Sequence, residues 1–221
     1  MKKIILVIGV VSLGLSAQLL AAPSTTVAFD KDTRALLRNA SPERGEAIAK
    51  KSKCAKCHGD NGVAEDAEDP TVAGQLATYS YKQLMDYKNG HRSDRSMKKA
   101  VKKLDAEMMA DLAVWFQSLP TPEPAKKHSD VGYKLAYKGD PKRMIKPCAT
   151  CHGRKGEGGM HDSAKLTGQG RDYFIATMQA FQEEDRTNDV YSRMRLIAME
   201  LTEEEIEALA DYYAAVPPVE E

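Results

Sequence analysis

The amino-acid sequence predicts an all-α protein in which one helical unit occurs twice. Apolar residues recur with the 3.6-residue period of a helix, and no stretch shows the sustained alternation of a strand. An internal repeat is the second observation, because Cys54 and Cys148 lie 94 residues apart, and so do Gly74 and Gly168, each of which opens a Gly-Gln pair. The third is the proline-rich segment 119–124, which has the composition of a semi-rigid linker.

These observations divide the 221-residue chain into four parts. We expect a signal peptide at 1–22, a first helical domain at 30–119, a linker at 120–128 and a second helical domain at 129–221. The first part has a basic start, an uncharged apolar run at 4–15 and small residues around 21–22, which is the order of a secretory signal. The apolar run is shorter than the roughly 20 residues of a membrane span, so a retained anchor is the alternative interpretation.

In the first domain we expect three helices. Ser41 followed by Pro42 is an N-cap with proline at the first helical position, so a helix should run from there towards Cys54. Apolar residues at helical spacing predict a second helix over 79–88. The last helix should follow Leu104-Asp105, with its apolar side formed by Met108, Met109, Leu112, Trp115 and Phe116.

The second domain shows the start and the end of its last helix. Thr202 and Glu205 form the pattern of a capping box, and Pro217-Pro218 should stop the helix. Gly45 and Gly139 each lie nine residues before the first cysteine of their half. We expect each glycine to let the first helix pass close to the last one, against Trp115 or Tyr212.

Each half contains the pentapeptide C-x-x-C-H, with Cys54, Cys57 and His58 in the first copy. This is the attachment pattern of a c-type haem. Two thiols bind the vinyl groups on one porphyrin edge, and the next residue turns its imidazole onto the iron as the proximal ligand. The second copy consists of Cys148, Cys151 and His152, so the sequence predicts two covalent haem c groups.

Two other uses of such cysteines fit less well. A structural zinc site would pair two C-x-x-C knuckles about 15–20 residues apart, whereas these motifs are much farther apart and each carries its own histidine. A thioredoxin-like dithiol expects a βαβ context and needs no histidine. All four cysteines of the chain lie in the two motifs, so none remains for a disulfide, a nucleophile or a further metal ligand.

The sixth iron ligand separates an electron carrier from an enzyme, because an open position suits gas binding or peroxide chemistry. Of ten methionines, Met97 and Met194 share a place in the repeat, seven residues before Leu104 and Leu201. We therefore expect the axial pairs His58–Met97 and His152–Met194. The matching Met85 and Met178 lie on amphipathic helices and are expected to pack in the core. Among the other histidines, only His91 is kept as an alternative ligand.

Charge is balanced over the chain but differs between the halves. The whole sequence has 32 basic and 32 acidic residues, whereas residues 30–119 contain 16 basic and 14 acidic ones and residues 120–221 contain 14 and 18. Nucleic-acid binding needs a dense basic face, so we expect no nucleic-acid partner. The uneven distribution suits a protein whose two ends present different surfaces to different partners.

The sequence resembles the cytochrome c4 family, class I dihaem cytochromes with two tandem cytochrome c domains. The resemblance covers most of the chain after the signal region, and its most specific stretches are 137–143, 147–158, 166–169 and 184–189, the last leading to Met194. The first half is less close, since the segment 89–97 keeps Met97 but few of its neighbours.

This resemblance implies two cytochrome c-like domains packed about a pseudo-twofold axis, each wrapped around one covalent haem, with the haem edges close together. It implies a periplasmic electron carrier, soluble or loosely associated with the membrane, with Met194 as an iron ligand. A quinol–cytochrome c reductase as donor and a terminal oxidase or reductase as acceptor are the partners that it implies.

Two other functions remain as alternatives to a free carrier that is not an enzyme. The chain could be the dihaem cytochrome subunit of a dehydrogenase, a role for which the same two-domain form serves. It could also be a small dihaem oxidoreductase, but a dihaem peroxidase needs one haem without a strong methionine. A thiosulfate dehydrogenase of this architecture would use a cysteine as distal ligand, and no cysteine is left over.

Overall fold

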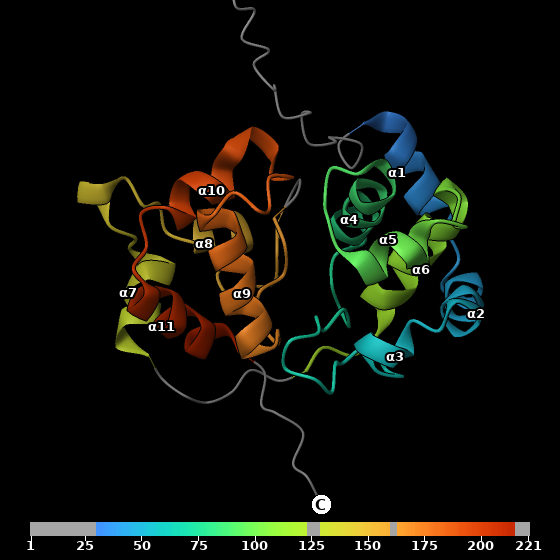
Figure 1. Cartoon of the computed structure of the whole chain (residues 1–221), viewed down its shortest axis with the longest axis horizontal. Coiled ribbons are helices and arrows are strands. Elements are labelled where there is room, and N and C mark those ends of the chain that lie inside the picture. The colour runs from blue at the N-terminus through green and yellow to red at the C-terminus, as the bar shows by residue number, and fades with distance from the viewer. Residues whose placement is uncertain (1–29, 123–128, 160–162, 215–221) are drawn as a thin grey trace, which may run out of the picture.

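The computed structural model describes residues 30–122, 129–159 and 163–214, and its helices form two lobes that face each other (Figure 1). Within these ranges the chain is helical and contains no strand, which confirms the expected all-α class. The expected signal peptide, residues 123–128 of the linker, His128, His161 and Pro217 lie outside the described residues. No described helix is long and apolar enough to cross a membrane.

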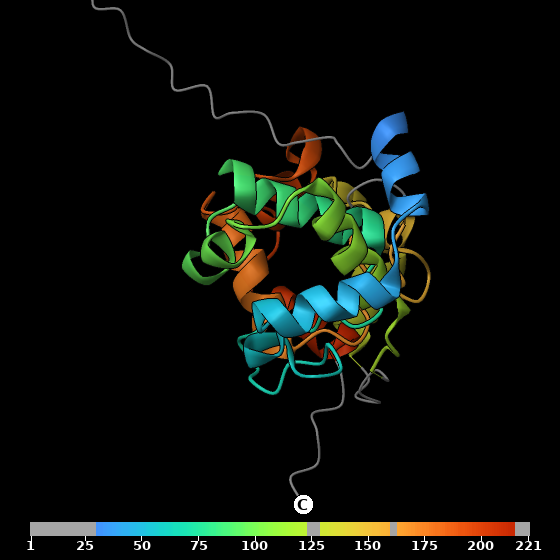
Figure 2. The ribbon, with the colours of Figure 1, turned by 90° about the vertical axis from the view of Figure 1, so that its right-hand side faces the viewer.

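The first lobe contains six helices along the chain. Their bounds are α1 Lys31–Arg38, α2 Pro42–Ser52, α3 Ala55–His58, α4 Ala77–Asn89, α5 Arg95–Val101 and α6 Ala106–Ser118. Helix α6 packs against both α2 and α4. In the view of Figure 2, α2 and α4 lie on opposite sides of this lobe.

The second lobe repeats the order of α2 to α6 and, among its described residues, has no counterpart of α1. Its helices are α7 Asp130–Tyr137, α8 Ala149–His152, α9 Arg171–Gln182, α10 Arg193–Ala198 and α11 Glu203–Tyr213, with short 3₁₀ turns η2 Pro141–Arg143 and η3 Val190–Ser192. Helix α11 packs against α7 and α9, as α6 packs against α2 and α4. Neither 3₁₀ turn has a counterpart among the described elements of the first lobe.

The expected caps fix where the helices begin. The Ser41 hydroxyl accepts a hydrogen bond from the Arg44 amide at the start of α2. The capping box of α11 is complete, since Thr202 Oγ1 accepts from the Glu205 amide and the Glu205 carboxylate accepts from the Thr202 amide. These local bonds satisfy amides that have no partner within the helix, so the helix starts follow from short sequence patterns.

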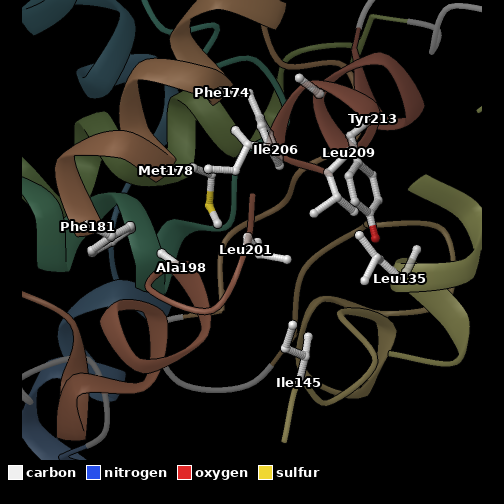
Figure 3. Packing of buried hydrophobic residues seen from close by; sticks show 12 residues of the cluster. Leu135, Ile145, Phe174, Met178, Phe181, Ala198, Leu201, Ile206, Leu209 and Tyr213 are labelled. Atoms are coloured by element: carbon white, nitrogen blue, oxygen red, sulfur yellow. The ribbon is translucent and has the colours of Figure 1, made fainter. Parts of the chain in front are cut away.

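Each lobe has its own apolar core. In the second lobe, Phe174 and Met178 of α9 meet Leu209 and Tyr213 of α11 (Figure 3), and all four side chains are buried. The first core is built in the same way around Tyr81 of α4 and the buried side of α6. Two separate cores are what a duplicated domain would have.

A glycine does stand at each helix crossing, but in the second lobe it is a different residue from the expected one. A Cβ on Gly45 would lie 2.1 Å from the Asp111 carbonyl oxygen of α6, so only glycine fits there. The equivalent residue is Gly132, where a Cβ would lie 2.3 Å from the Ala208 carbonyl oxygen and 2.8 Å from Tyr212 Cβ. The prediction for Gly139 was therefore wrong.

Gly139 instead ends α7 in a tight turn. Its φ of +64° belongs to the left-handed region that favours glycine, and it opens the loop in which Asp140 pairs with Ile145. This loop adds seven residues between the crossing glycine and the second cysteine motif. Arg143 of the loop forms an ion pair with Glu205 of α11 at 2.6 Å, which ties the insertion to the capping box.

Candidate haem centres

One cavity between the lobes contains both expected iron-binding pairs. His58 and Met97 line it from the first lobe, and His152 and Met194 line it from the second. The rest of its wall comes from both lobes and includes Gln75, Tyr79, Gln83, Tyr87, Arg92, Phe116, Gln169, Tyr173, Phe174, Thr177, Met178, Phe181 and Arg186. The structure thus brings together all four residues expected as axial ligands.

Each C-x-x-C-H motif folds as a single helical turn. In the first lobe the turn is α3, preceded by Cys54, and Cys54 is partly buried while Cys57 is exposed. Cys148 and Cys151 repeat this arrangement at α8. Burial raises the pKa of the Cys148 thiol to about 11, so this position favours an uncharged sulfur such as the thioether of haem c.

The two histidines are held by backbone carbonyls. His58 Nδ1 lies 2.9 Å from the Pro70 carbonyl oxygen, and His152 Nδ1 lies 2.7 Å from the Ala164 carbonyl oxygen. A carbonyl can only accept, so Nδ1 carries the proton in each ring and Nε2 keeps its lone pair. A metal-binding histidine is usually oriented in this way, so both rings fit the role of proximal ligand.

The two methionines lie on the short helices α5 and α10, which are not among the helices expected from the sequence. An aspartate fixes each of them: Asp94 accepts from the Met97 amide at 2.7 Å, and Asp189 accepts from the Met194 amide at 3.0 Å. Both methionines are half-buried. Asp94 is the N-cap of α5, whereas Asp189 lies ahead of η3 and reaches the Met194 amide from outside α10, so an acidic side chain holds the backbone at each methionine.

The alternative ligand His91 does not line this cavity. Its Nδ1 lies 3.6 Å from Asp86 Oδ1 on the same lobe, and neither atom has a hydrogen-bond partner. The matching Met178 does line the cavity, although it was expected in the core; it is buried on α9 and belongs to the second apolar core.

Two arginines in the cavity wall were missed in the sequence. Arg92 donates to the Tyr173 hydroxyl of the other lobe at 3.0 Å, and Arg186 donates to the Tyr79 hydroxyl at 2.9 Å. Both pairs follow the repeat, because Arg92 and Arg186 are 94 residues apart and so are Tyr79 and Tyr173. Extending the repeat from the cysteines to this segment would have identified them.

The cavity wall therefore has a cationic region that suits an anion. Burial raises the pKa of Tyr173, but the nearby charges of Arg92 and Arg186 outweigh this and leave its pKa at about 8. The carboxylates that a haem carries as propionates would match two such arginines. With the oriented histidines and the paired cysteines, the donors present fit two haem c groups.

A buried polar cluster joins the lobes next to these arginines. The side chains of Lys82 and Asp86 on α4 are fully buried, and Lys82 Nζ lies 2.5 Å from Asp86 Oδ2. Lys82 also donates to the Asn188 carbonyl at 2.7 Å, and Asn188 Nδ2 donates to Asp86 at 2.6 Å and to Gln83 at 3.0 Å. This cluster has no mirror copy, so it is specific to one side of the interface.

Comparison with known proteins shows which family the chain resembles. The cytochrome c family model matches residues 42–120. A thiosulfate dehydrogenase electron acceptor from Stutzerimonas stutzeri is 34% identical over 74% of this chain and 78% of its own length, and cytochrome c4 from Thiocapsa roseopersicina is 33% identical over 77% and 90%.

The fold has a match among solved structures as well. The crystal structure of reduced cytochrome c4 from Pseudomonas stutzeri superposes with a TM-score of 0.74 and 28% identity, covering 80% of this chain and 99% of that one. The expected family, the two covalent haem c groups and the electron-carrier function are thereby confirmed. The chain belongs to the cytochrome c4 family of dihaem electron carriers.

Proposed function

We propose that this protein is a periplasmic carrier that passes single electrons between membrane-bound respiratory complexes and is not itself an enzyme. The observation that supports this most strongly is the single cavity lined by both His/Met pairs. Bound haem iron supplies a one-electron change between its ferric and ferrous states. Residues of this chain would attach and orient the two haems and would occupy the remaining binding position of each iron.

In this proposal each lobe supplies four residues to its haem. Cys54 and Cys57 form the thioethers in the first lobe, with His58 and Met97 on the iron. In the second lobe the corresponding residues are Cys148, Cys151, His152 and Met194. Arg92 and Arg186 would hold propionates at the interface, where their guanidinium groups already bridge the lobes.

Closed coordination is what distinguishes a carrier from an enzyme here. A methionine on the distal side of each iron leaves no position for peroxide or another small molecule. The chain has four cysteines, all of them in the two motifs, so none can act as the distal cysteine of a thiosulfate-oxidising centre. Export to the periplasm fits the expected signal peptide at 1–22, because haem c is attached after translocation.

The surface around Met97 differs from the surface around Met194. Beside Met97, helix α5 exposes the basic residues Arg95, Lys98 and Lys99. Beside Met194, the second lobe instead exposes the apolar side chains of Tyr191 and Leu196, at 86% and 64%. We infer that one end docks an acidic partner by charge and the other docks a partner mainly by apolar contact.

A second candidate for the electron donor has support of its own. A quinol–cytochrome c reductase as donor and a terminal oxidase or reductase as acceptor follow from the family. However, relatives from Stutzerimonas stutzeri and Thiomonas intermedia, 34% and 30% identical, are electron acceptors of a thiosulfate dehydrogenase. The second candidate is therefore that this chain accepts electrons from, or is a subunit of, such a dehydrogenase.

Rapid mixing of the haem-loaded protein with each partner tests the proposal. The ferric protein should be reduced by quinol plus quinol–cytochrome c reductase and then oxidised by a terminal oxidase, and thiosulfate alone should not reduce it. Reduction by thiosulfate only when a thiosulfate dehydrogenase is present would support the second candidate. Catalytic turnover of thiosulfate or peroxide by the chain alone would contradict the carrier function.

The variant K98E/K99E tests whether α5 is a docking surface. The association rate with one of the two partners should fall severalfold at low salt, and this loss should shrink as ionic strength rises, because screening weakens long-range attraction. The matched control is K134E/K138E, which reverses two lysines of the other lobe outside the cavity wall. Equal slowing with both partners, or no salt dependence, would show that the α5 lysines do not select a partner.

A further inference from the structure

A glutamine from each lobe binds one residue of the other lobe through two hydrogen bonds. Gln169 Oε1 accepts from the Thr71 amide at 2.8 Å, and its Nε2 donates to the Thr71 carbonyl at 3.0 Å. Gln75 makes the same pair of bonds with Lys165, at 2.8 and 3.0 Å. These are the glutamines of the repeated Gly-Gln pairs, and Thr71 and Lys165 are also 94 residues apart.

The amide that Gln169 binds belongs to a peptide group that also holds a proximal histidine. The Thr71 N–H and the Pro70 carbonyl are the two ends of a single peptide bond. That carbonyl accepts the hydrogen bond from His58 Nδ1 at 2.9 Å. The second lobe therefore reaches the histidine of the first through one peptide plane.

The mirror path has the same connections in the opposite direction. The Lys165 N–H, bound by Gln75, shares its peptide bond with the Ala164 carbonyl. That carbonyl accepts from His152 Nδ1 at 2.7 Å. Each lobe thus contributes one glutamine to the histidine of the other.

Each glutamine is also held by a hydrogen bond within its own lobe. Gln75 Oε1 also accepts from the Leu76 amide at 3.0 Å, and Gln169 Oε1 accepts from the Gly170 amide at 2.9 Å. Gln75 is 7% exposed, so its amide is largely shielded from competing water. An oxygen held in this way is a fixed acceptor, and its effect on the neighbouring peptide is not averaged by side-chain rotation.

We propose that Gln75 and Gln169 are positioning residues that tune the haem of the opposite lobe. When a peptide N–H donates a hydrogen bond to the glutamine Oε1, electron density in that peptide shifts towards its carbonyl oxygen, which then accepts the histidine Nδ1–H bond more strongly. A stronger bond there makes the imidazole a more electron-rich ligand and favours ferric iron. Docking of the two lobes thereby lowers the potential of both haems.

This proposal rests on the proposed axial roles of His58 and His152. Its particular consequence is a crossed effect, in which a change in one lobe alters the iron of the other. A glutamine that only held the interface together would affect both irons alike when it was removed. The experiment therefore compares the two glutamines against each iron in turn.

Resonance Raman spectroscopy of the ferrous, haem-loaded protein can observe one iron at a time. A five-coordinate ferrous haem shows the iron–histidine stretching band, whereas a six-coordinate low-spin haem does not. In a Met97→Ala background the band should report His58 alone. Adding Gln169→Leu should then lower its frequency, while adding Gln75→Leu should leave it unchanged. In a Met194→Ala background, which reports His152, the two glutamines should exchange roles.

Potentials of variants with both methionines in place give a second readout. Gln169→Leu should raise the potential of the first haem by a shift equivalent to about a threefold change in its one-electron equilibrium constant, about 28 mV at 59 mV per tenfold. The variant Gln169→Glu keeps an acceptor oxygen opposite the Thr71 amide, so its potential should not rise.

Three results would overturn the proposal. An iron–histidine band that is present but unmoved by either glutamine would show that the peptide transmits nothing. Movement of both bands by both glutamines would show a general loosening of the interface. Absence of any iron–histidine band in both methionine backgrounds would contradict the axial assignments themselves, and the proposed effect of the glutamines would fail with them.

Discussion

Met194→Ala is expected to open the iron of the second lobe and to lower its potential. The thioether favours ferrous iron over harder ligands such as water or hydroxide, so its loss stabilises the ferric state. Half of the weak far-red absorption band of methionine-ligated ferric haem should disappear, and one carbon monoxide should bind per reduced protein. Met97→Ala should produce the same changes at the first haem. Absorption spectra and redox titration of each variant measure these effects.

Met178→Leu is the matched control for this experiment. Met178 also lines the cavity, but it is buried in the second core, so leucine should preserve both the packing and the spectrum. His91→Ala is the second control, because its ring faces Asp86. If Met97→Ala leaves the spectrum unchanged while His91→Ala alters it, the first haem has two histidine ligands and our assignment is wrong.

Lys82→Met is expected to cost the protein about 3–5 kcal/mol of unfolding free energy, the usual result of leaving one partner of a buried ion pair without the other. Lys82 and Asp86 are both fully buried, and the substitution also removes the bond from Lys82 to the Asn188 carbonyl. Denaturant unfolding of the haem-loaded protein, followed by circular dichroism, measures the change. Because Asn188 belongs to the other lobe, separation of the lobes should become easier as well.

The exposed pair Lys50–Glu46 provides a control with the same spacing along a helix. Its side chains are 75% and 48% exposed, so Lys50→Met should leave stability unchanged within error. Adding Asp86→Leu to Lys82→Met should recover part of the loss, because no unpaired buried charge then remains. A single Lys82→Met variant as stable as the wild type would show that water or another group compensates Asp86.

Local patterns in the sequence were sufficient for much of the fold and for proposing the residues that would hold the haems. The Ser41 cap and the Thr202–Glu205 capping box depend on residues three apart, so the structure contains them as expected. The cysteine motifs are equally local. Met97 and Met194 required the repeat, and the structure places both at the cavity, although their role as ligands remains a proposal.

The crossing at Gly45 was predicted, but several other features that depend on contacts between distant segments were not. Gly139 has the expected distance from Cys148, yet Gly132 makes the crossing, because seven inserted residues cannot be recognised without knowing which glycine faces α11. The arginine and glutamine bonds between the lobes were missed for a related reason. Arg92 and Gln169 each bind a residue of the opposite lobe, so these bonds can be recognised only when the two lobes are placed together.

The hydrogen bonds between the lobes connect the two proposed haem sites. Arg92, Arg186, Gln75 and Gln169 all cross from one lobe to the other, and each has its counterpart in the repeat. Duplication alone would give two independent haem proteins joined by a linker. These crossed bonds instead make each centre depend on its neighbour, so the docked pair is the functional unit.

Carbon monoxide titration of the fully reduced wild-type protein tests whether methionine closes both irons. With both irons closed in this way, the protein carries electrons and performs no chemistry on a substrate. We expect two covalent haems per chain and no spectral change at carbon monoxide concentrations that saturate Met194→Ala. Stoichiometric binding of carbon monoxide to either haem of the wild type would contradict it and would favour a dihaem enzyme.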